Sequence, residues 1–420
     1  MNGRLQNESS GVRSSESKPP LASAKPSYLV VGLWGNKVRG FRMRVCILLI
    51  FIACLSHGTF AGEMEHIIVY RDDTLYHIIP WLLQLKNGDL VLTAREAHAR
   101  SQEQRGHVDP TARGILLRSR DDGRTWGEKV VVDDETYRFS QTEDGPLAQL
   151  SDGSLLLNLY SWAISPFPVG FPTDGGRPYA YTFEGEWTLR SIDLGRTWTP
   201  RQRLKVTGLP RLAARTPVLE LPDHTLLLAV YGNPSPGQDY RNASPEQPYH
   251  SWVIRSTDMG KTWGSPAVLA ADSEKKIAFA EPCLLRARSG ELIAMMRTEG
   301  YLYQRNSSDS GHTWSQPIKT AMWGFPAHLL ELRDGRILCT YGYRRKPYGV
   351  RASISKDGGK TWDVQNEIVL RNDGGTHDLG YPSSVELPDG RVLTTYWFNQ
   401  QKEGDPTSET RFIAGTFYRP

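Results

Sequence analysis

An eight-residue motif, Ser-x-Asp-x-Gly-x-Thr-Trp, occurs five times in this 420-residue chain and restricts its fold more than any other feature. The copies are SRDDGRTW (119–126), SIDLGRTW (191–198), STDMGKTW (256–263), SSDSGHTW (307–314) and SKDGGKTW (355–362). Each copy has the residues of a tight turn, in which the aspartate accepts hydrogen bonds from its own turn and the glycine takes a positive φ. Five copies indicate an array of similar supersecondary units.

A second repeat alternates with the first and consists of two apolar strands joined by a short turn. The turns are centred on Gly88, Gly153, His224, Gly290, Gly335 and Gly390. Six hairpins predict an all-β protein, a six-bladed β-propeller with four antiparallel strands per blade, in which the eight-residue motif joins the third strand to the fourth. The chain stops after a third strand at 411–418, so we expect residues 66–70 to supply the missing strand and close the last blade. The propeller domain then spans residues 63–420.

The first 61 residues have a different composition from this domain. Residues 1–42 are rich in Ser, Lys, Pro and Gly and precede Met43, which suggests a disordered leader or a mis-assigned start. Residues 43–61 combine a basic flank, a short apolar run and a small residue at Ala61, the layout of a signal peptide. The apolar run is short for a membrane span. We expect an exported protein, secreted or periplasmic, with no transmembrane span in the mature chain; a lipid anchor at Cys54 is the alternative.

Composition excludes some classes of partner. The chain has 50 Lys and Arg against 46 Asp and Glu, and no run of five or six like charges, so nucleic-acid binding is not expected. Cys283 and Cys339 lie in apolar strand-like runs and are expected to be buried free thiols. No metal-ligand spacing is present, so we expect no metal or cofactor. We expect a monomer whose partner is a glycan or polysaccharide.

The motifs and hairpins together resemble those of the sialidase (neuraminidase) superfamily, whose six-bladed propellers carry this motif as the Asp box or BNR repeat. The resemblance covers essentially the whole chain after the leader. It is more specific for fold than for chemistry, because carbohydrate-binding proteins and other glycosidases carry Asp boxes too. It implies an exo-acting, retaining glycoside hydrolase resembling an exo-α-sialidase, with an Asp acid/base, a Tyr–Glu nucleophile pair and three arginines that bind a carboxylate.

The resemblance assigns the catalytic roles to Asp109, Glu281 and Tyr381. Asp109 lies in the loop before the first box, Glu281 begins an inner strand, and Tyr381 heads the last inner hairpin. A phenol suits a sugar whose anomeric carbon bears a carboxylate, because a neutral nucleophile avoids repulsion by that charge. The plain alternatives are an Asp-Pro turn, an ion pair between Glu281 and Arg297, and a tyrosine packed between blades.

Arginines are the expected carboxylate ligands, because their planar guanidinium donates two parallel hydrogen bonds. Arg297 returns on the hairpin to the same end as Glu281, and Arg345 is favoured over the adjacent Arg344 for the third arginine of the family. Further candidate substrate contacts are His77, Arg95, His107 and His328.

The chain departs from the family at the first arginine, which sialidases carry in an Arg-Ile-Pro motif. The corresponding stretch, LYHIIPWLL at 75–83, has no arginine. Either Arg71 or Arg95 takes its place, or His77 substitutes, or the substrate is not a sialic acid. Two other functions therefore stay open: a propeller glycosidase or lyase for another acidic or deoxy sugar, and a non-catalytic carbohydrate-binding propeller.

Overall fold

The computed structural model describes residues 64–99, 108–143, 145–165, 181–209, 211–233, 249–274, 276–402 and 405–420. These residues belong to one compact unit, 60–420. The expectations for residues 1–61 and for His107 lie outside the described residues.

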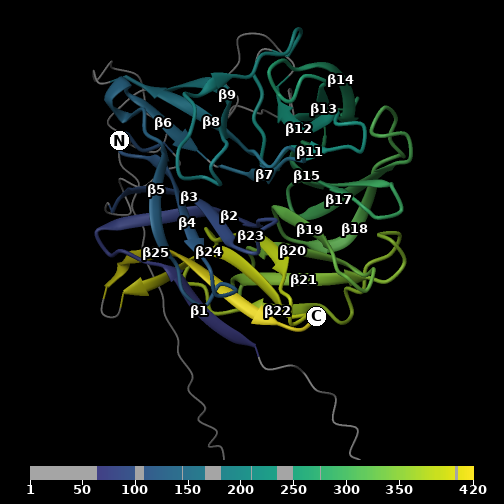
Figure 1. Ribbon diagram of the computed structural model, residues 1–420. Helices are drawn as coiled ribbons and strands as arrows, with labels where there is room; N and C mark the ends of the chain where they lie inside the picture. The colour runs from purple at the N-terminus through teal and green to yellow at the C-terminus, as the bar shows by residue number, and fades with distance from the viewer. Residues whose placement is uncertain are drawn as a thin grey trace, which may run out of the picture. The chain divides into compact units, whose positions relative to one another are not determined.

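The described chain forms six antiparallel sheets around a common centre, the predicted six-bladed propeller (Figure 1). Blade 1 contains β2 (Leu75–Gln84), β3 (Leu90–His98), β4 (Arg113–Ser119) and β5 (Gly127–Asp133). Blade 2 contains β6 (Ser140–Glu143), β7 (Leu147–Gln149), β8 (Leu155–Ile164), β9 (Tyr181–Ser191) and β10 (Gln202–Arg203). Blade 3 contains β11 (Leu219–Glu220), β12 (Leu226–Gly232), β13 (His250–Ser256) and β14 (Gly264–Ala270). Blade 4 contains β15 (Ala280–Arg286), β16 (Leu292–Arg297), β17 (Tyr301–Ser307) and β18 (Ile318–Trp323). Blade 5 contains β19 (Ala327–Glu331), β20 (Ile337–Tyr343), β21 (Gly349–Ser355) and β22 (Ile368–Arg371). Blade 6 contains β23 (Gly380–Glu386), β24 (Val392–Lys402), β25 (Asp405–Tyr418) and β1 (Glu65–Tyr70). A 3-10 turn, η2 (Thr136–Arg138), precedes β6.

The last blade is closed by the strand nearest the N-terminus, as the sequence predicts. β1 pairs antiparallel with β25, so that His66 lies opposite Thr416 and Ile68 opposite Ala414. This pairing gives β25 a partner on each side, since β24 bonds to its other edge. Closure therefore removes an open sheet edge of the kind that invites association.

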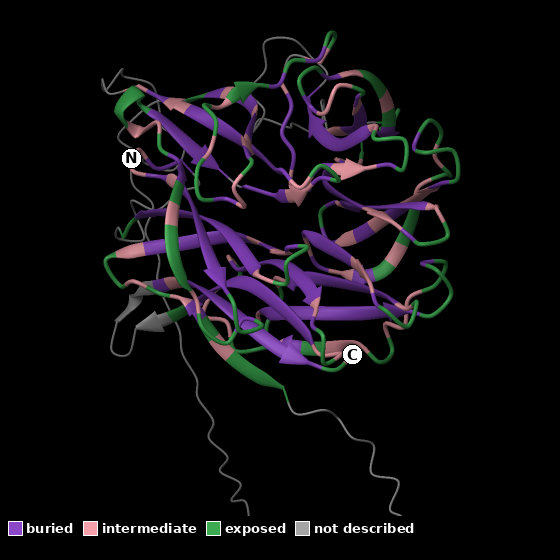
Figure 2. Ribbon diagram, in the orientation of Figure 1, coloured by how far each residue is buried: buried purple, intermediate pink, exposed green. Residues whose placement is uncertain are grey.

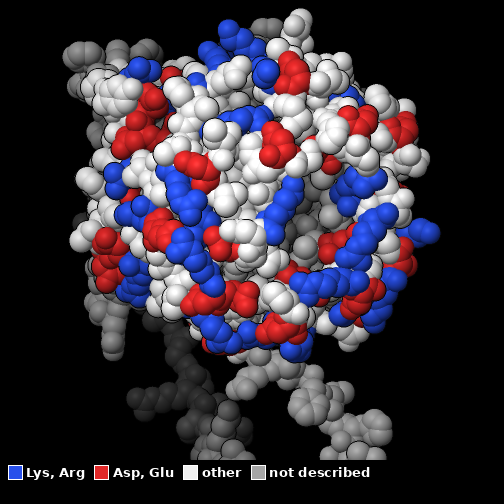
Figure 3. All heavy atoms as spheres, in the orientation of Figure 1, with Lys and Arg blue, Asp and Glu red and all other residues white. Residues whose placement is uncertain are grey.

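The hydrophobic core consists of apolar layers between neighbouring blades. One layer joins blades 1 and 6 and includes Ile78, Trp397 and Phe417, and a similar layer lies in each of the other five seams. Figure 2 shows that burial is concentrated in the inner strands, whereas the outer strands β1 and β5 are more exposed. Figure 3 shows basic and acidic side chains interspersed on one face. Because apolar layers pack against both faces of the inner strands, these strands provide rigid support for a site on the axis.

The five Asp boxes fold as the predicted turns. In the box at 256–263, the Asp258 carboxylate accepts hydrogen bonds from the Thr262 amide at 2.9 Å and from its hydroxyl at 2.6 Å. The Ser256 hydroxyl donates to Asp258 at 2.7 Å and accepts from the Gly260 amide at 2.8 Å. The same bonds occur in the other four boxes. Each box thus satisfies its own polar groups, which explains why one sequence recurs in five places.

Inter-blade hydrogen bonds connect the inner hairpin turns of neighbouring blades. The backbone amide of a turn residue donates to a side chain at the end of the next inner strand: Lys86 to Gln149 at 2.8 Å, Ser151 to Glu220 at 2.6 Å, Arg288 to Glu331 at 2.7 Å, and Arg333 to Glu386 at 2.6 Å. At the other two seams the turn residue is Pro222 or Pro388, which has no N–H to donate. The matching positions in the next blades hold Arg286 and Gln84. An acceptor is therefore bonded in this way only where the preceding blade offers a donor.

This ring predicts a difference between two equivalent positions. Glu331→Ala removes the acceptor of the Arg288 amide, and we expect it to lower the free energy of unfolding by about 1 kcal/mol. Arg286→Ala is the matched control, because the turn that it faces is closed by Pro222 and no such bond is lost. Thermal unfolding should show a decrease in Tm of about 2 °C for the first variant and none for the second. Equal shifts would contradict this account of the seams.

Candidate active site

A proline stands in or just before the inner strand of all six blades, a third repeat within the propeller. The pairs are Ile79-Pro80, Gly145-Pro146, Thr216-Pro217, Glu281-Pro282, Phe325-Pro326 and Tyr381-Pro382. In three blades the residue before the proline has a positive φ: 61° at Ile79, 41° at Glu281 and 52° at Tyr381. The ladder to the second strand is interrupted at each of these three places. Such bulges redirect a side chain, and a positive φ in a non-glycine residue costs about 1–3 kcal/mol, strain that tends to be kept at functional sites.

Two of these strained residues, from blades 4 and 6, meet each other. The Tyr381 hydroxyl donates to Glu281 Oε1 at 3.1 Å. Arg297 Nη1 donates to Glu281 Oε2 at 2.7 Å and to the Tyr381 oxygen at 3.2 Å. A phenol, a carboxylate and a guanidinium thus form a closed triangle of hydrogen bonds at the head of the inner strands.

Two more guanidiniums lie against the same tyrosine. Arg215 Cζ lies 4.0 Å from the centre of the Tyr381 ring, and Arg344 Cζ lies 5.4 Å from it. Phe325 packs beneath Arg297 at 4.2 Å and beneath Arg344 at 5.1 Å. We call Arg215, Arg297 and Arg344 the arginine cluster. It concentrates positive charge from blades 3, 4 and 5 at one place, as binding a carboxylate requires.

The arginine cluster sets the ionisation of the pair. Burial alone would raise the pKa of Glu281, but the charges of Arg297, Arg215 and Arg344 outweigh it and hold that pKa below its ordinary value. Burial and the neighbouring Glu281 charge raise the pKa of Tyr381. At neutral pH the pair therefore consists of a carboxylate beside a protonated phenol, the state in which Glu281 can accept the phenol proton.

Asp109 belongs to a second polar group, on blade 1. Its carboxylate is fully buried and accepts from the Thr111 amide at 2.8 Å, from the Thr111 hydroxyl at 2.7 Å and from the Tyr76 hydroxyl at 3.4 Å. Arg95 donates to the same Tyr76 oxygen at 3.5 Å and lies 3.2 Å from the Glu143 carboxylate. Val108, the residue before Asp109, packs in one apolar cluster with Ala280, the residue before Glu281.

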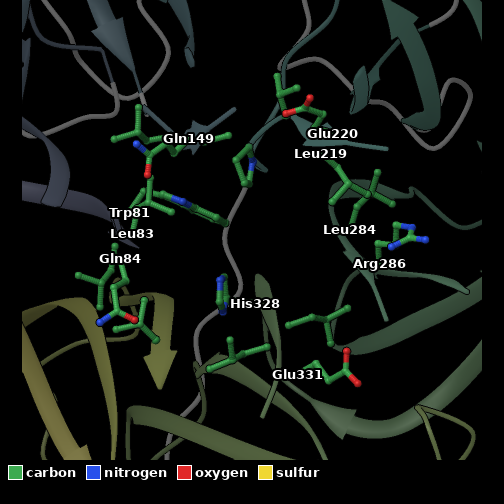
Figure 4. A pocket seen from close by; sticks show the side chains of 18 of the residues that line it. Trp81, Leu83, Gln84, Gln149, Leu219, Glu220, Leu284, Arg286, His328 and Glu331 are labelled. Carbon is green, nitrogen blue, oxygen red and sulfur yellow. The ribbon is translucent and has the colours of Figure 1, made fainter. Parts of the chain in front are cut away.

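Three predicted substrate contacts lie apart from the triangle of Glu281, Arg297 and Tyr381. Arg345 is exposed and stacks on Trp323 at 3.8 Å, so its neighbour Arg344 supplies the blade 5 arginine. His77 is bonded to Glu96 at 3.2 Å, and because Arg95 and Glu96 are consecutive in β3, this pair lies on the opposite blade face from Arg95. His328 lines a cavity farther along the inner strands (Figure 4). His107 lies outside the described residues.

Sequence reasoning missed Arg215, although a signal for it exists. Arg215 stands one residue before the Thr216-Pro217 pair, and this pair is equivalent to Glu281-Pro282 and Tyr381-Pro382. Aligning the six inner strands on their prolines would have brought Arg215 next to the two catalytic candidates.

Comparison with known proteins is consistent with the propeller and its repeats. Residues 175–394 match the family model described as "BNR repeat-like domain". A protein of unknown function from Dyadobacter fermentans is 28% identical, with a TM-score of 0.71 over 84% of this chain and 98% of that one. The NanB sialidase from Streptococcus pneumoniae is 13% identical, with a TM-score of 0.57 over 84% of this chain and 70% of that one. The α-L-arabinanase from Penicillium chrysogenum is 15% identical, with a TM-score of 0.55 over 85% and 99%. No curated protein matches the chain.

Proposed function

This chain belongs to the BNR repeat-like domain family within the sialidase superfamily of six-bladed propellers, and from that premise we propose that it is an exo-acting, retaining glycoside hydrolase that removes a terminal acidic sugar from glycans. The hydrogen bond between Tyr381 and Glu281, inside the arginine cluster, is the observation that carries the proposal. Sialidases and an arabinanase are among the proteins of similar fold, so glycoside hydrolysis is the chemistry that they have in common.

In the proposed first step, Tyr381 Oη attacks the anomeric carbon as its proton passes to Glu281. Arg297 donates a hydrogen bond to the phenol oxygen at 3.2 Å and so favours the developing negative charge. Asp109 protonates the departing glycosidic oxygen. In the second step Asp109 removes a proton from water, the water attacks the anomeric carbon, and the bond to Tyr381 breaks as Glu281 returns the proton. Two displacements at one carbon retain the anomeric configuration.

The arginine cluster supports an acidic sugar as the substrate class. Ile78 occupies the first position of the Ile-Ile-Pro stretch where sialidases have arginine, and it is buried. Arg215 brings a third guanidinium from another blade, so the cluster again has three positive charges. Arg297 pairs with Glu281 at 2.7 Å, and Arg344 lies 4.0 Å from the Asp378 carboxylate, so a substrate carboxylate would join a network that already contains acidic groups.

A substrate screen and one variant, Asp109→Ala, test the proposal. The 4-methylumbelliferyl glycoside of N-acetylneuraminic acid should be hydrolysed, and Asp109→Ala should lose more activity on sialyllactose than on this glycoside, because methylumbelliferone leaves without protonation. Turnover of 4-methylumbelliferyl glucuronide alone would indicate that the substrate is a uronic acid. The buried Ile78, which stands where sialidases have arginine, would explain that preference. Glycan binding with no turnover of any glycoside would overturn the proposal in favour of a binding propeller.

Two adjacent arginines give a prediction with an internal control. Arg344→Gln removes a guanidinium beside Tyr381 and should raise KM roughly 10- to 100-fold, the cost of losing one charged hydrogen bond to a desolvated carboxylate. Arg345→Gln changes the same charge one residue away, on the exposed face of Trp323, and should leave KM within about twofold. Steady-state kinetics on the hydrolysed glycoside measure both. The reverse ranking would restore Arg345 as the substrate ligand.

We propose that the propeller domain, residues 63–420, works outside the cytoplasm, where glycans are displayed. Residues 43–61 then act as the signal peptide, and the described residues contain no helix that is long and apolar enough to cross a membrane. N-terminal sequencing of the exported protein should start close to residue 62. A mature protein that begins at Met1 or Met43 would contradict cleavage, and one that begins at a lipid-modified Cys54 would establish the anchor instead.

A further inference from the structure

The six inner strands enclose a cavity of about 830 Å³ on the propeller axis. It runs from Trp81 and His328 toward the hairpin turns, and Figure 4 shows these two side chains beside it. Glu281 and Tyr381 head the same strands at the opposite end. The cavity is therefore separate from the candidate active site, and its size is within the range of small-molecule sites.

Most charged groups at the turn end of the cavity already have partners. The carboxylates of Glu220, Glu331 and Glu386 accept the inter-blade hydrogen bonds from turn amides. Lys86 donates to the Leu150 carbonyl at 2.7 Å, and Arg333 donates to the Leu387 carbonyl at 2.8 Å. These side chains hold neighbouring blades together and are not available to a ligand.

Two polar groups of the cavity are unused. Within the part of the chain that the structure describes, the Arg286 guanidinium makes no hydrogen bond or ion pair. His328 is 7% exposed, and its Nδ1 has no hydrogen-bond partner in the described residues. Burial lowers the pKa of His328 to about 4, so the ring is neutral at physiological pH. A buried ring nitrogen without a partner is costly unless a ligand or water completes it.

An aromatic surface completes the lining. Trp81 is half-buried, and its ring meets the His328 ring edge-on with the centres 5.1 Å apart. Leu83, Leu219 and Leu284 form apolar walls around the same space. Figure 4 places Arg286 across the cavity from Trp81. A flat ring, a neutral imidazole and a free guanidinium suit a molecule that has an apolar ring face at one side and an anionic group at the other.

We propose that the axial cavity is a second ligand site, for an acidic monosaccharide. The sugar ring packs on Trp81 beside the His328 ring, and the carboxylate pairs with Arg286. The guanidinium supplies the charge, since it is the cation of the lining that has no other partner. The site is independent of hydrolysis at Tyr381 and needs no reaction of its ligand.

Calorimetric titration of the intact protein with free D-glucuronate, and with methyl glucoside as the uncharged probe, tests this site. An Arg297→Ala background removes a carboxylate ligand from the candidate active site, so binding in the axial cavity should persist there. Within that background, Arg286→Gln should weaken glucuronate binding at least tenfold. Arg288→Gln changes the same charge at the same turn outside the cavity and should alter binding less than twofold.

Methyl glucoside should bind at least tenfold more weakly than glucuronate in the Arg297→Ala protein. The proposal is overturned if glucuronate does not bind there, if Arg286→Gln binds as well as Arg288→Gln, or if the uncharged probe binds equally. A failure of hydrolysis in the glycoside screen would leave these titrations unaffected, so the two proposals fail separately.

Discussion

Tyr381→Phe is expected to lower kcat by roughly 1,000-fold or more while KM stays within about threefold. The phenol oxygen is the proposed nucleophile, and phenylalanine has no atom that can form the covalent bond to the sugar. The arginine cluster, which we propose binds the acidic group, remains in place. Such a loss in kcat alone is the signature of a group that acts in the reaction and contributes little to ground-state binding.

The chain provides a matched control for this variant. Tyr341 is a second buried tyrosine whose hydroxyl donates to a carboxylate, that of Glu367, and it lies in blade 5 on β20. Tyr341→Phe removes a comparable buried hydrogen bond and should leave kcat within about twofold after its change in Tm is recorded. If Tyr381→Phe keeps more than a tenth of the wild-type kcat, water attacks the sugar directly, and the product should then show inverted configuration by NMR.

The fold could be predicted from the sequence because its repeated turns are stabilised locally. The Asp258 side chain bonds to amides and hydroxyls within four residues, so its role can be inferred without knowing what packs against it. The closing strand was predictable by counting, since five boxes and six hairpins leave one blade without its outer strand. In both cases a short sequence contains the whole cause of the structure.

The site was predictable only where the backbone direction is simple. Glu281 and Arg297 are joined by one hairpin, so their return to the same end follows from strand length. Arg344 and Arg345 could not be distinguished, because consecutive residues point to opposite sides and the sequence does not say which side faces the axis. Arg215 depends on contacts between blades 3 and 6, which are far apart in the chain.

Glu186→Gln is expected to make the protein more stable at high pH, in contrast to most substitutions of buried residues. Glu186 lies on β9 and is 1% exposed, and it has no cationic partner in the described residues. Its oxygens accept from Asn158 Nδ2 at 3.1 Å and from the Ala214 amide at 3.0 Å. Burial raises its pKa to about 8, more than these two hydrogen bonds lower it.

The sign of the pH effect follows from proton binding. Between the ordinary glutamate pKa of 4.5 and the folded pKa of about 8, the folded protein keeps a proton on Glu186 that the unfolded chain releases. The free energy of unfolding therefore decreases through this window as the pH rises, by roughly 1.4 kcal/mol per pH unit. Above the folded pKa the decrease ends, because both states are then ionised. Glutamine is neutral at every pH, so its variant should not show this decrease.

Glutamine can also satisfy the neighbours of Glu186. Its Oε1 accepts from the Ala214 amide, and its Nε2 can donate to Asn158 Oδ1, a buried oxygen without a hydrogen-bond partner in the described residues, once that amide is turned by 180°. Thermal unfolding from pH 5 to pH 9 should show nearly equal Tm values for wild type and Glu186→Gln at pH 5. Near pH 8 the Tm of the variant should be higher by about 5 °C.

Glu96→Gln gives the opposite control. Hydrogen bonds from His77, Arg113 and Lys129 overcome burial and hold the Glu96 pKa at about 2, so its loss should destabilise the protein at neutral pH. Parallel Tm curves for wild type and Glu186→Gln would show that Glu186 is ionised in the folded protein throughout this range.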